Sequence, residues 1–449
     1  MWGYVKILEI KEDDTKMKKI ILTCILIVAF VGVSISSTLA YSVDSIEFWS
    51  TDGFSPVSGV TEVAKLYEEA WREFEKKTGI KIKHDLIRGG TEGYQQILAA
   101  VAANNLPDVA ILDGFWVPRI AVLGALQPLN GLWPEEDRKD FHPAVIEAVT
   151  IDDNIYALWF YNAYRGLFYR RDMIEEIGYN ESPTEWNEFV EMCKKLTNEE
   201  RYAVMFPGTP SETTTLHMLP IFMGYGGRLV DEDGKPILHE GENREALKKT
   251  YKHFYDLVNV HEVMPYSIVT IDEGDLRRYF YADEVAMIGT TSSSLMQYKQ
   301  ERPDIYECMD VTSHPMLEGY TAIPTLVGWT YAIFTEEPEK KQAAWDFIAH
   351  MTRPELLGTL NKAHGHLPVR RSIYDTVDLF KEDPIFRRLR GITFEAEIRP
   401  RPPVPIYITA SSLIALYLEP ILSGELDIEE AIDIIGKEAI KEWERLEVR

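Results

Sequence analysis

The alternation of strand and helix patterns between residues 43 and 112 constrains the fold more than any other feature of the chain. Val43–Ser50 is a short β-like run, Val60–Thr78 places apolar residues at helical spacing, and Ile80–His84 alternates like a strand. A second helix pattern follows at Tyr94–Asn104, and then a nearly continuous apolar strand at Pro107–Leu112. Strand, helix, strand units of this kind favour a parallel sheet, so the fold class is predicted to be α/β.

Candidate binding residues follow the first and third of these strands. Ligands of open α/β sheets bind beyond the carboxyl ends of the strands, which makes Trp49, Asp113 and Trp116 candidates for a pocket. Two plainer readings stay open. Trp49 can be a core residue, and Asp113 can be a helix N-cap.

The stretch Ile155–Met173 contains seven aromatic residues, and polar residues such as Asn162 and Arg165 interrupt them. Such a run cannot face a core along its whole length, so part of it is predicted to face a cavity. Tryptophan and tyrosine offer a flat apolar face with a polar edge, which suits a sugar. A buried pair of strands is the alternative. The candidates for ligand contact are Trp159, Tyr161, Asn162 and Tyr164.

Length and charge bound the class of protein. With 449 residues the chain is long for a single core, which predicts two domains or lobes. Its formal charge of −25 at pH 7 disfavours nucleic acid and anionic membrane surfaces as partners, because no basic patch is apparent that would offset the repulsion.

Residues 1–40 have the pattern of a secretory signal peptide. Lysines precede the apolar run Ile20–Val33, and the small residues that follow include a cleavage-site pattern at Thr38–Ala40. Acidic residues upstream of Met17 do not fit a signal sequence, so translation is predicted to start at Met17. The protein is therefore expected to be exported, with a mature charge of −26, and retention of the segment as a membrane anchor is the alternative.

Export permits a disulfide, and two cysteines lie outside the signal segment, Cys193 and Cys308. Nothing in the sequence shows whether they meet, so a disulfide and two buried thiols are both open.

Patterns of enzymes, metal sites and cofactor sites are not apparent. The chain lacks Gly-x-Ser-x-Gly, His-Glu-x-x-His, Cys-x-x-Cys and Gly-x-x-x-x-Gly-Lys. The acidic turn Asp231–Gly234 lacks the full ligand spacing of a calcium loop and is interpreted as a hairpin turn. We therefore expect no enzymatic activity, no metal and no cofactor. A secreted glycosidase is the alternative, because with 72 acidic residues some pair of carboxylates always looks plausible.

Ordered segments along most of residues 44–440 resemble the extracellular solute-binding proteins of ABC sugar importers, the family of maltose-binding protein. The segments that carry the resemblance are Gly124–Leu129, Ile155–Leu158, Leu167–Asp172, Ser182–Phe189, Tyr281–Ile288, Pro324–Phe334, Glu336–Pro354, Gly365–Arg371 and Ser423–Ala431.

The resemblance implies a two-lobed type II periplasmic-binding-protein fold with hinge crossovers and a ligand cleft between the lobes. The chain is expected to leave the first lobe near Ile155–Tyr161, to return near Val285–Ser294 and to cross again near Leu326–Tyr331. On this reading residues 41–155 plus about 286–328 form the first lobe, and residues 156–285 plus about 329–449 form the second.

The resemblance also implies a function and further site residues. A monomer is expected that binds a neutral carbohydrate and delivers it to the membrane permease subunits of the importer. Two positions where the family often has aromatic residues carry small hydroxyls here, at Ser293 and at Ala410–Ser412, which argues against a maltodextrin ligand. The further candidates for ligand contact are Tyr225, Ser293, Trp329, Arg371 and Tyr407.

Polyols and glycerol phosphate remain alternative ligands. A phosphate would need a cationic anchor, and the candidates are Arg88, Arg119 and Arg165.

Overall fold

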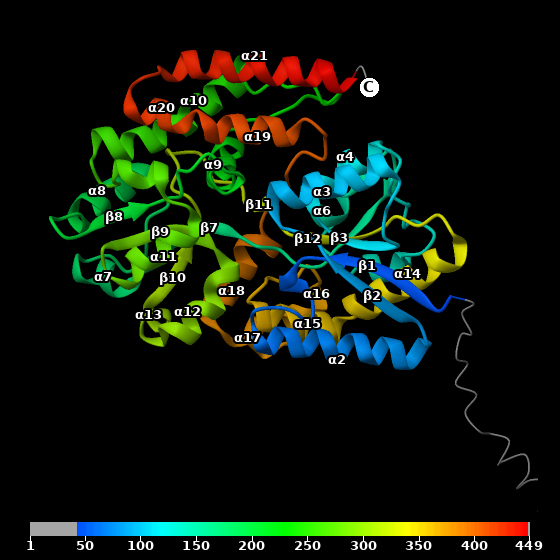
Figure 1. The fold of residues 1–449 in the computed structure, drawn as a ribbon. Coiled ribbons are helices and arrows are strands. Elements are labelled where there is room, and N and C mark those ends of the chain that lie inside the picture. Colours follow the sequence, from blue (N-terminus) through cyan, green and yellow to red (C-terminus); the bar gives the residue numbers. More distant parts are fainter. Residues whose placement is uncertain (1–42, 448–449) are drawn as a thin grey trace, which may run out of the picture.

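Two lobes lie side by side in the computed structural model, and each is built on a β-sheet flanked by helices (Figure 1). The structure describes residues 43–447, so the predicted signal peptide lies outside the described part of the chain. Within residues 43–447, no helix is long and apolar enough to cross a membrane.

The first lobe contains a five-stranded sheet with the order β2-β1-β3-β12-β6. Strand β1 pairs in parallel with both β2 and β3, as the alternating pattern predicts, whereas β12 runs antiparallel between β3 and β6. The strands are β1 (Ser45–Ser50), β2 (Lys81–Leu86), β3 (Val109–Asp113), β6 (Ala157–Trp159) and β12 (Trp329–Ile333).

Helix α2 (Thr61–Thr78) shows how the sequence pattern produces this lobe. Its buried residues Val63, Tyr67 and Phe74 recur at helical spacing and pack into the core. The helix ends where Gly79 adopts a left-handed conformation with φ of 79° and its N–H donates to a carbonyl of the last turn. The lobe also contains α3 (Gly90–Ala103), α4 (Val117–Val122), α5 (Glu135–Arg138), α6 (Pro143–Glu147), α14 (Pro338–Thr352) and α15 (Pro354–His364).

The second lobe contains a four-stranded sheet with the order β10-β7-β9-β8. Its strands are β7 (Arg165–Arg170), β8 (Tyr202–Met205), β9 (Val285–Thr291) and β10 (Met309–Thr312). Its helices are α7 (Arg171–Glu176), α8 (Trp186–Leu196), α9 (Glu212–Gly224), α10 (Gly241–Tyr255), α11 (Glu273–Tyr281), α12 (Leu295–Glu301), α13 (Pro303–Cys308), α19 (Tyr407–Leu416), α20 (Leu418–Ser423) and α21 (Ile428–Glu447). Helices α19, α20 and α21 lie together along the top of this lobe (Figure 1).

Four short strands complete the structure. Strand β11 (Thr325–Leu326) pairs in parallel with β13 (Arg399–Pro400) where the chain passes between the lobes, and β4 (Thr150–Ile151) forms a small hairpin with β5 (Asn154–Ile155) just before β6 in the first lobe. From the first lobe to the second, the chain runs through α16 (Arg371–Thr376), α17 (Asp378–Glu382) and α18 (Pro384–Arg390), where α16 contacts α15 and α18 contacts β10 (Figure 1).

The predicted division of the chain between the lobes is wrong after residue 285. Strands β9 and β10 stay in the sheet of the second lobe, because β9 pairs with both β7 and β8 and β10 pairs with β7. The chain therefore returns to the first lobe between residues 313 and 328, not at Val285–Ser294. Residues 329–364 then belong to the first lobe, since β12 lies in its sheet and α14 and α15 pack on α2. The first crossing, between β6 and β7, begins within the predicted range.

Two local questions left by the sequence are settled. Asp231–Gly234 forms a hairpin turn, in which the Asp231 N–H donates to the Lys235 carbonyl at 2.9 Å. Cys193 and Cys308 are both free thiols, and Cys193 is buried in α8.

Candidate ligand-binding site

The candidate site lies where the end of β3 in the first lobe meets the beginning of α9 in the second. Asp113 is the last residue of β3 and caps a 3-10 turn, Gly114–Trp116. Glu212 is the first residue of α9. Arg401, from the segment between β13 and α19, lies between these two carboxylates and bonds to both.

Arg401 is the centre of this cluster. Its Nη2 donates to Asp113 Oδ1 at 2.8 Å and its Nη1 to Glu212 Oε1 at 3.2 Å, while only 2% of its side chain is exposed. Its guanidinium carbon lies 4.5 Å from the centroid of the Phe115 ring. We name the group formed by Asp113, Arg401 and Glu212 the interlobe triad.

Neighbouring hydroxyls fix the carboxylate of Glu212. The Tyr407 hydroxyl donates to Oε1 at 2.7 Å, and the Ser411 hydroxyl donates to Oε2. Both residues lie on α19, which packs against α9. Glu212 is therefore anchored within the second lobe, whereas the Asp113 carboxylate has Arg401 and the Phe115 N–H as its donors.

Burial dominates the electrostatics of the triad. Desolvation raises the pKa of Asp113, although Arg401 acts in the opposite direction. Burial also disfavours the charge on Arg401, but the carboxylates beside it raise its pKa overall. The guanidinium therefore stays charged and pairs with carboxylates on both sides.

Aromatic rings form a wall beside the triad. The Trp116 ring is fully buried and meets the half-buried Trp329 edge to face, with centroids 5.3 Å apart. Tyr94 lies 5.8 Å from Trp116, and the Trp116 indole N–H is buried with no hydrogen-bond partner among the described residues. Rings from several elements thus converge with buried polar groups, the combination that small-molecule sites use.

Trp159, Tyr161 and Asn162 form the first crossing between the lobes and are largely buried. The Trp159 indole N–H donates to the Tyr161 carbonyl at 2.6 Å, and the Tyr161 ring stacks on His366 with centroids 3.7 Å apart. Asn162 exchanges main-chain hydrogen bonds with Leu367. The aromatic stretch thus packs mainly into the hinge, because these rings fill the space between the crossing segments.

A second polar cluster adjoins the crossing from the second lobe. Arg165, which begins β7, pairs with Glu273 at 3.2 Å, and His217 lies 3.4 Å from the same carboxylate. Burial disfavours the charge of Glu273, but Arg165 and His217 lower its pKa overall. Burial raises the pKa of the Tyr161 hydroxyl, and the charges of Asp113, Arg165 and Arg401 also act on it. Tyr161 therefore lies within electrostatic reach of both clusters.

The other residues proposed from the sequence are dispersed. Trp49 is partly buried against the core of the first lobe, and the Tyr164 hydroxyl donates to the Thr312 carbonyl inside the second. Tyr225 bonds to His253, far along α9. Ser293 lies in a turn after β9, and Arg371 is exposed on α16 with its guanidinium 5.4 Å from the Phe394 ring.

Of the twelve candidates, Asp113, Trp116, Trp329 and Tyr407 lie at or beside the triad, and Trp159 and Tyr161 lie directly behind it.

Sequence reasoning missed Glu212, Arg401 and Phe115. Glu212 follows a Pro-Ser pair at the start of a helix, and Arg401 lies between prolines, so both resemble ordinary surface residues in the sequence. Their 189-residue separation hides the contact. Only Ser411 carried a signal, as one of the small hydroxyls that replace the family's aromatic residues.

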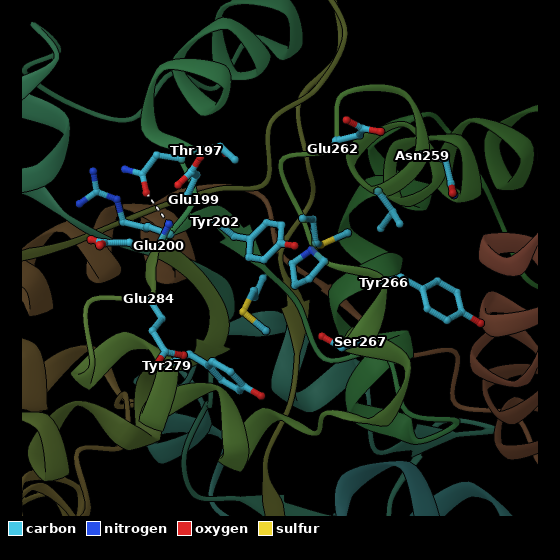
Figure 2. Close-up of a pocket in the computed structure, with 16 residues that line it drawn as sticks. Thr197, Glu199, Glu200, Tyr202, Asn259, Glu262, Tyr266, Ser267, Tyr279 and Glu284 are labelled. Carbon is cyan, nitrogen blue, oxygen red and sulfur yellow. Dashed lines mark hydrogen bonds between the residues drawn. The ribbon is translucent and has the colours of Figure 1, made fainter.

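Two cavities help to delimit the site. One of about 150 Å³ lies directly behind Arg401, between α9 and β13, and is too small for a sugar larger than one ring. Another of about 630 Å³ opens at the far end of the second lobe, with Tyr202, Tyr266 and Tyr279 around it (Figure 2). Because the second lobe alone lines it, closure of the lobes cannot enclose a ligand there.

Comparison with known proteins finds similar chains. The family described as bacterial extracellular solute-binding protein matches residues 58–356. A probable ABC transporter-binding protein from Deinococcus radiodurans is 26% identical over 398 residues, which cover 86% of this chain and 89% of that protein.

Two solved structures are similar over most of the chain. The maltose-bound MalE3 protein of T. maritima is 26% identical, with a TM-score of 0.74 and coverage of 88% of this chain and 98% of that one. A solute-binding protein from Thermotoga lettingae bound to α-D-tagatose is 27% identical, with a TM-score of 0.73 and coverage of 89% and 99%.

Proposed function

This chain belongs to the bacterial extracellular solute-binding proteins, and from that premise we propose that it captures a neutral carbohydrate between its lobes for an ABC importer. The similar structures carry maltose and α-D-tagatose, both uncharged sugars. Delivery to membrane permease subunits, action as a monomer and an extracytoplasmic location are parts of the same proposal. The binding role requires no covalent chemistry, only closure of two lobes over a ligand.

The interlobe triad is the observation that carries the choice of a neutral ligand. Asp113 and Glu212 offer carboxylate oxygens that accept hydrogen bonds from sugar hydroxyls, and Trp116 and Trp329 beside them offer apolar ring faces. Two carboxylates and one guanidinium carry a net negative charge at neutral pH. An anionic ligand would be repelled from this part of the cleft.

Three of the arginines that could hold a phosphate support the same choice. Arg401 is occupied by two carboxylates, Arg165 by Glu273 and Arg88 by Glu92, the last pair at 3.2 Å. A phosphate would have to displace a carboxylate from its partner. The mature charge of −26 adds a long-range repulsion of anions.

A thermal-shift screen over sugars, polyols and sugar phosphates tests the proposal. A ligand bound by the native state alone raises the apparent stability by RT ln(1 + [L]/Kd), so a neutral sugar should raise Tm and its phosphate ester should not. Small-angle scattering with the best sugar should then show a smaller radius of gyration. Stabilisation by sugar phosphates alone would reject the neutral ligand, and an unchanged radius at saturation would reject lobe closure.

A further inference from the structure

The interlobe triad joins residues of both lobes through a single buried side chain. Asp113 moves with the sheet of the first lobe, and Glu212 moves with α9 and α19 of the second. Opening the cleft separates these two carboxylates. It therefore breaks at least one of the two ion pairs that Arg401 makes.

We propose that Arg401 is a positioning residue that clasps the lobes together, and that the Asp113–Arg401 ion pair is the contact that forms on closure and breaks on opening. The proposal rests on the proposed function, because it assigns how much of the ligand affinity depends on closure. A ligand that binds the closed state alone has an apparent Kd equal to its intrinsic Kd divided by the closed fraction.

The asymmetry of the triad identifies the pair that breaks. The carboxylate of Glu212 is held on both oxygens by hydroxyls of α19, and Arg401 also lies 5.9 Å from the Tyr407 ring of that helix. Asp113 lacks such hydroxyl partners among the described residues, and the donors to its carboxylate are Arg401 and the Phe115 N–H. The contacts of Arg401 with Asp113 and Phe115 are the shorter ones, but its main chain leads directly into α19, which packs on α9 of the second lobe. Arg401 therefore travels with the second lobe.

The geometry also explains why the clasp is an arginine. One planar guanidinium reaches a carboxylate in each lobe through two different nitrogens while its face covers the ring of Phe115. A lysine at this position has one nitrogen and no planar face. It would retain the charge but could not hold both carboxylates in this arrangement.

The chain provides a matched control in Arg370. This arginine is also buried, with 6% of its side chain exposed, and it also bonds two carboxylates, Asp137 at 2.5 Å and Asp140 at 2.7 Å. Those carboxylates lie three residues apart in one segment of the first lobe. Replacing Arg370 thus removes an equally buried double ion pair without removing a contact between the lobes.

The experiment measures the distance between spin labels placed on exposed helix positions, one on α2 and one on α8, without added sugar. The variant Asp113→Asn removes only the ion pair proposed to break. Arg401→Lys removes the planar guanidinium with its two donor nitrogens but keeps the positive charge. A hydrogen bond between charged groups is lost in both, so the ratio of closed to open protein should fall about tenfold or more. Arg370→Met should leave this ratio unchanged, and its fold is checked by circular dichroism.

Two results would overturn the clasp. One is a distance distribution for Asp113→Asn and Arg401→Lys that equals that of the unsubstituted protein. The other is an equal shift in Arg370→Met, which would show a general loss of order. Because no sugar is present, a chain that binds none of the sugars screened can still confirm the clasp, so the two proposals fail separately. With maltose or α-D-tagatose added as probes, any affinity found should fall in Arg401→Lys by the same factor as the closed fraction.

Discussion

Substituting Gly114 by alanine tests how closely the Trp159 ring of the hinge packs on the turn that follows Asp113. A Cβ atom at this position would lie 2.2 Å from two carbons of the Trp159 ring, whereas ordinary contacts begin near 3.4 Å. The ring would have to move by more than about 1 Å. It has no free direction, because it is 2% exposed, its N–H donates to the Tyr161 carbonyl, and Gly328 packs against its other edge.

Overpacking of this kind costs about 1–3 kcal/mol of unfolding free energy. The matched control is Gly53→Ala, where a Cβ atom meets no heavy atom within 4 Å and the backbone is not left-handed. That substitution should change stability by less than about 1 kcal/mol and can be stabilising, because alanine restricts the unfolded chain. Equilibrium unfolding in urea measures both variants, with the midpoint compared at constant slope. Equal midpoints for Gly114→Ala and Gly53→Ala would refute the reasoning.

Three further predictions concern stacking, charge and pH. Trp159→Ala should lower the unfolding free energy by about 3–5 kcal/mol because the ring is buried, whereas Trp329→Ala should leave the fold intact and weaken sugar binding by about 1–3 kcal/mol. Urea unfolding measures the stability of both variants and calorimetry their sugar affinity, and equal destabilisation by the two substitutions would contradict the assignment. The affinity for a neutral sugar should change less than about threefold between 0.05 and 0.5 M salt, since screening acts on charges, and a steep loss would indicate a phosphorylated ligand. Burial lowers the pKa of His253 from 6.5 to about 4, and its ring stays neutral between the Tyr225 hydroxyl and the Lys249 carbonyl. The unfolded chain protonates His253 more readily than the folded protein does, so its contribution to stability is complete above about pH 6.5 and falls by up to about 3 kcal/mol as the pH drops towards 4. In urea unfolding at several pH values, His253→Gln should reduce the dependence of the unfolding free energy on pH between about 4 and 6.5, and an unchanged dependence would rule out His253 as its source.

Much of the first lobe could be predicted from local patterns. The strand and helix patterns of residues 43–112 correspond to β1, α2, β2, α3 and β3, and the pairing of β1 with β2 and β3 is parallel as expected. Asp113 and Trp116 could be proposed as site residues because the end of a strand is a local feature that the sequence displays, and Asp113 is the last residue of β3. The acidic turn at Asp231 was likewise readable, because turn chemistry depends on neighbouring residues.

The pairing of distant strands could not be read in this way. Strand β9 begins with the apolar run of residues 285–288, which are all buried because both faces of the strand are covered, and such a run carries no sign of which sheet it joins. Its position between β7 and β8 depends on the packing of the whole second lobe. This is why the predicted return crossing was placed too early, so that residues 286–312 were assigned to the first lobe and residues 329–364 to the second.

The sequence by itself thus determined the α/β class, the family and the local elements, because these depend on periodicity and on ordered short motifs. Only the tertiary structure decided that Arg401 meets Asp113 and Glu212. Asp113 and Glu212 lie 288 and 189 positions before Arg401 along the chain, and neither Glu212 nor Arg401 differs in the sequence from an ordinary surface charge. Two carboxylates come together around one buried guanidinium only when the two lobes meet, because in water each charge would remain separately hydrated.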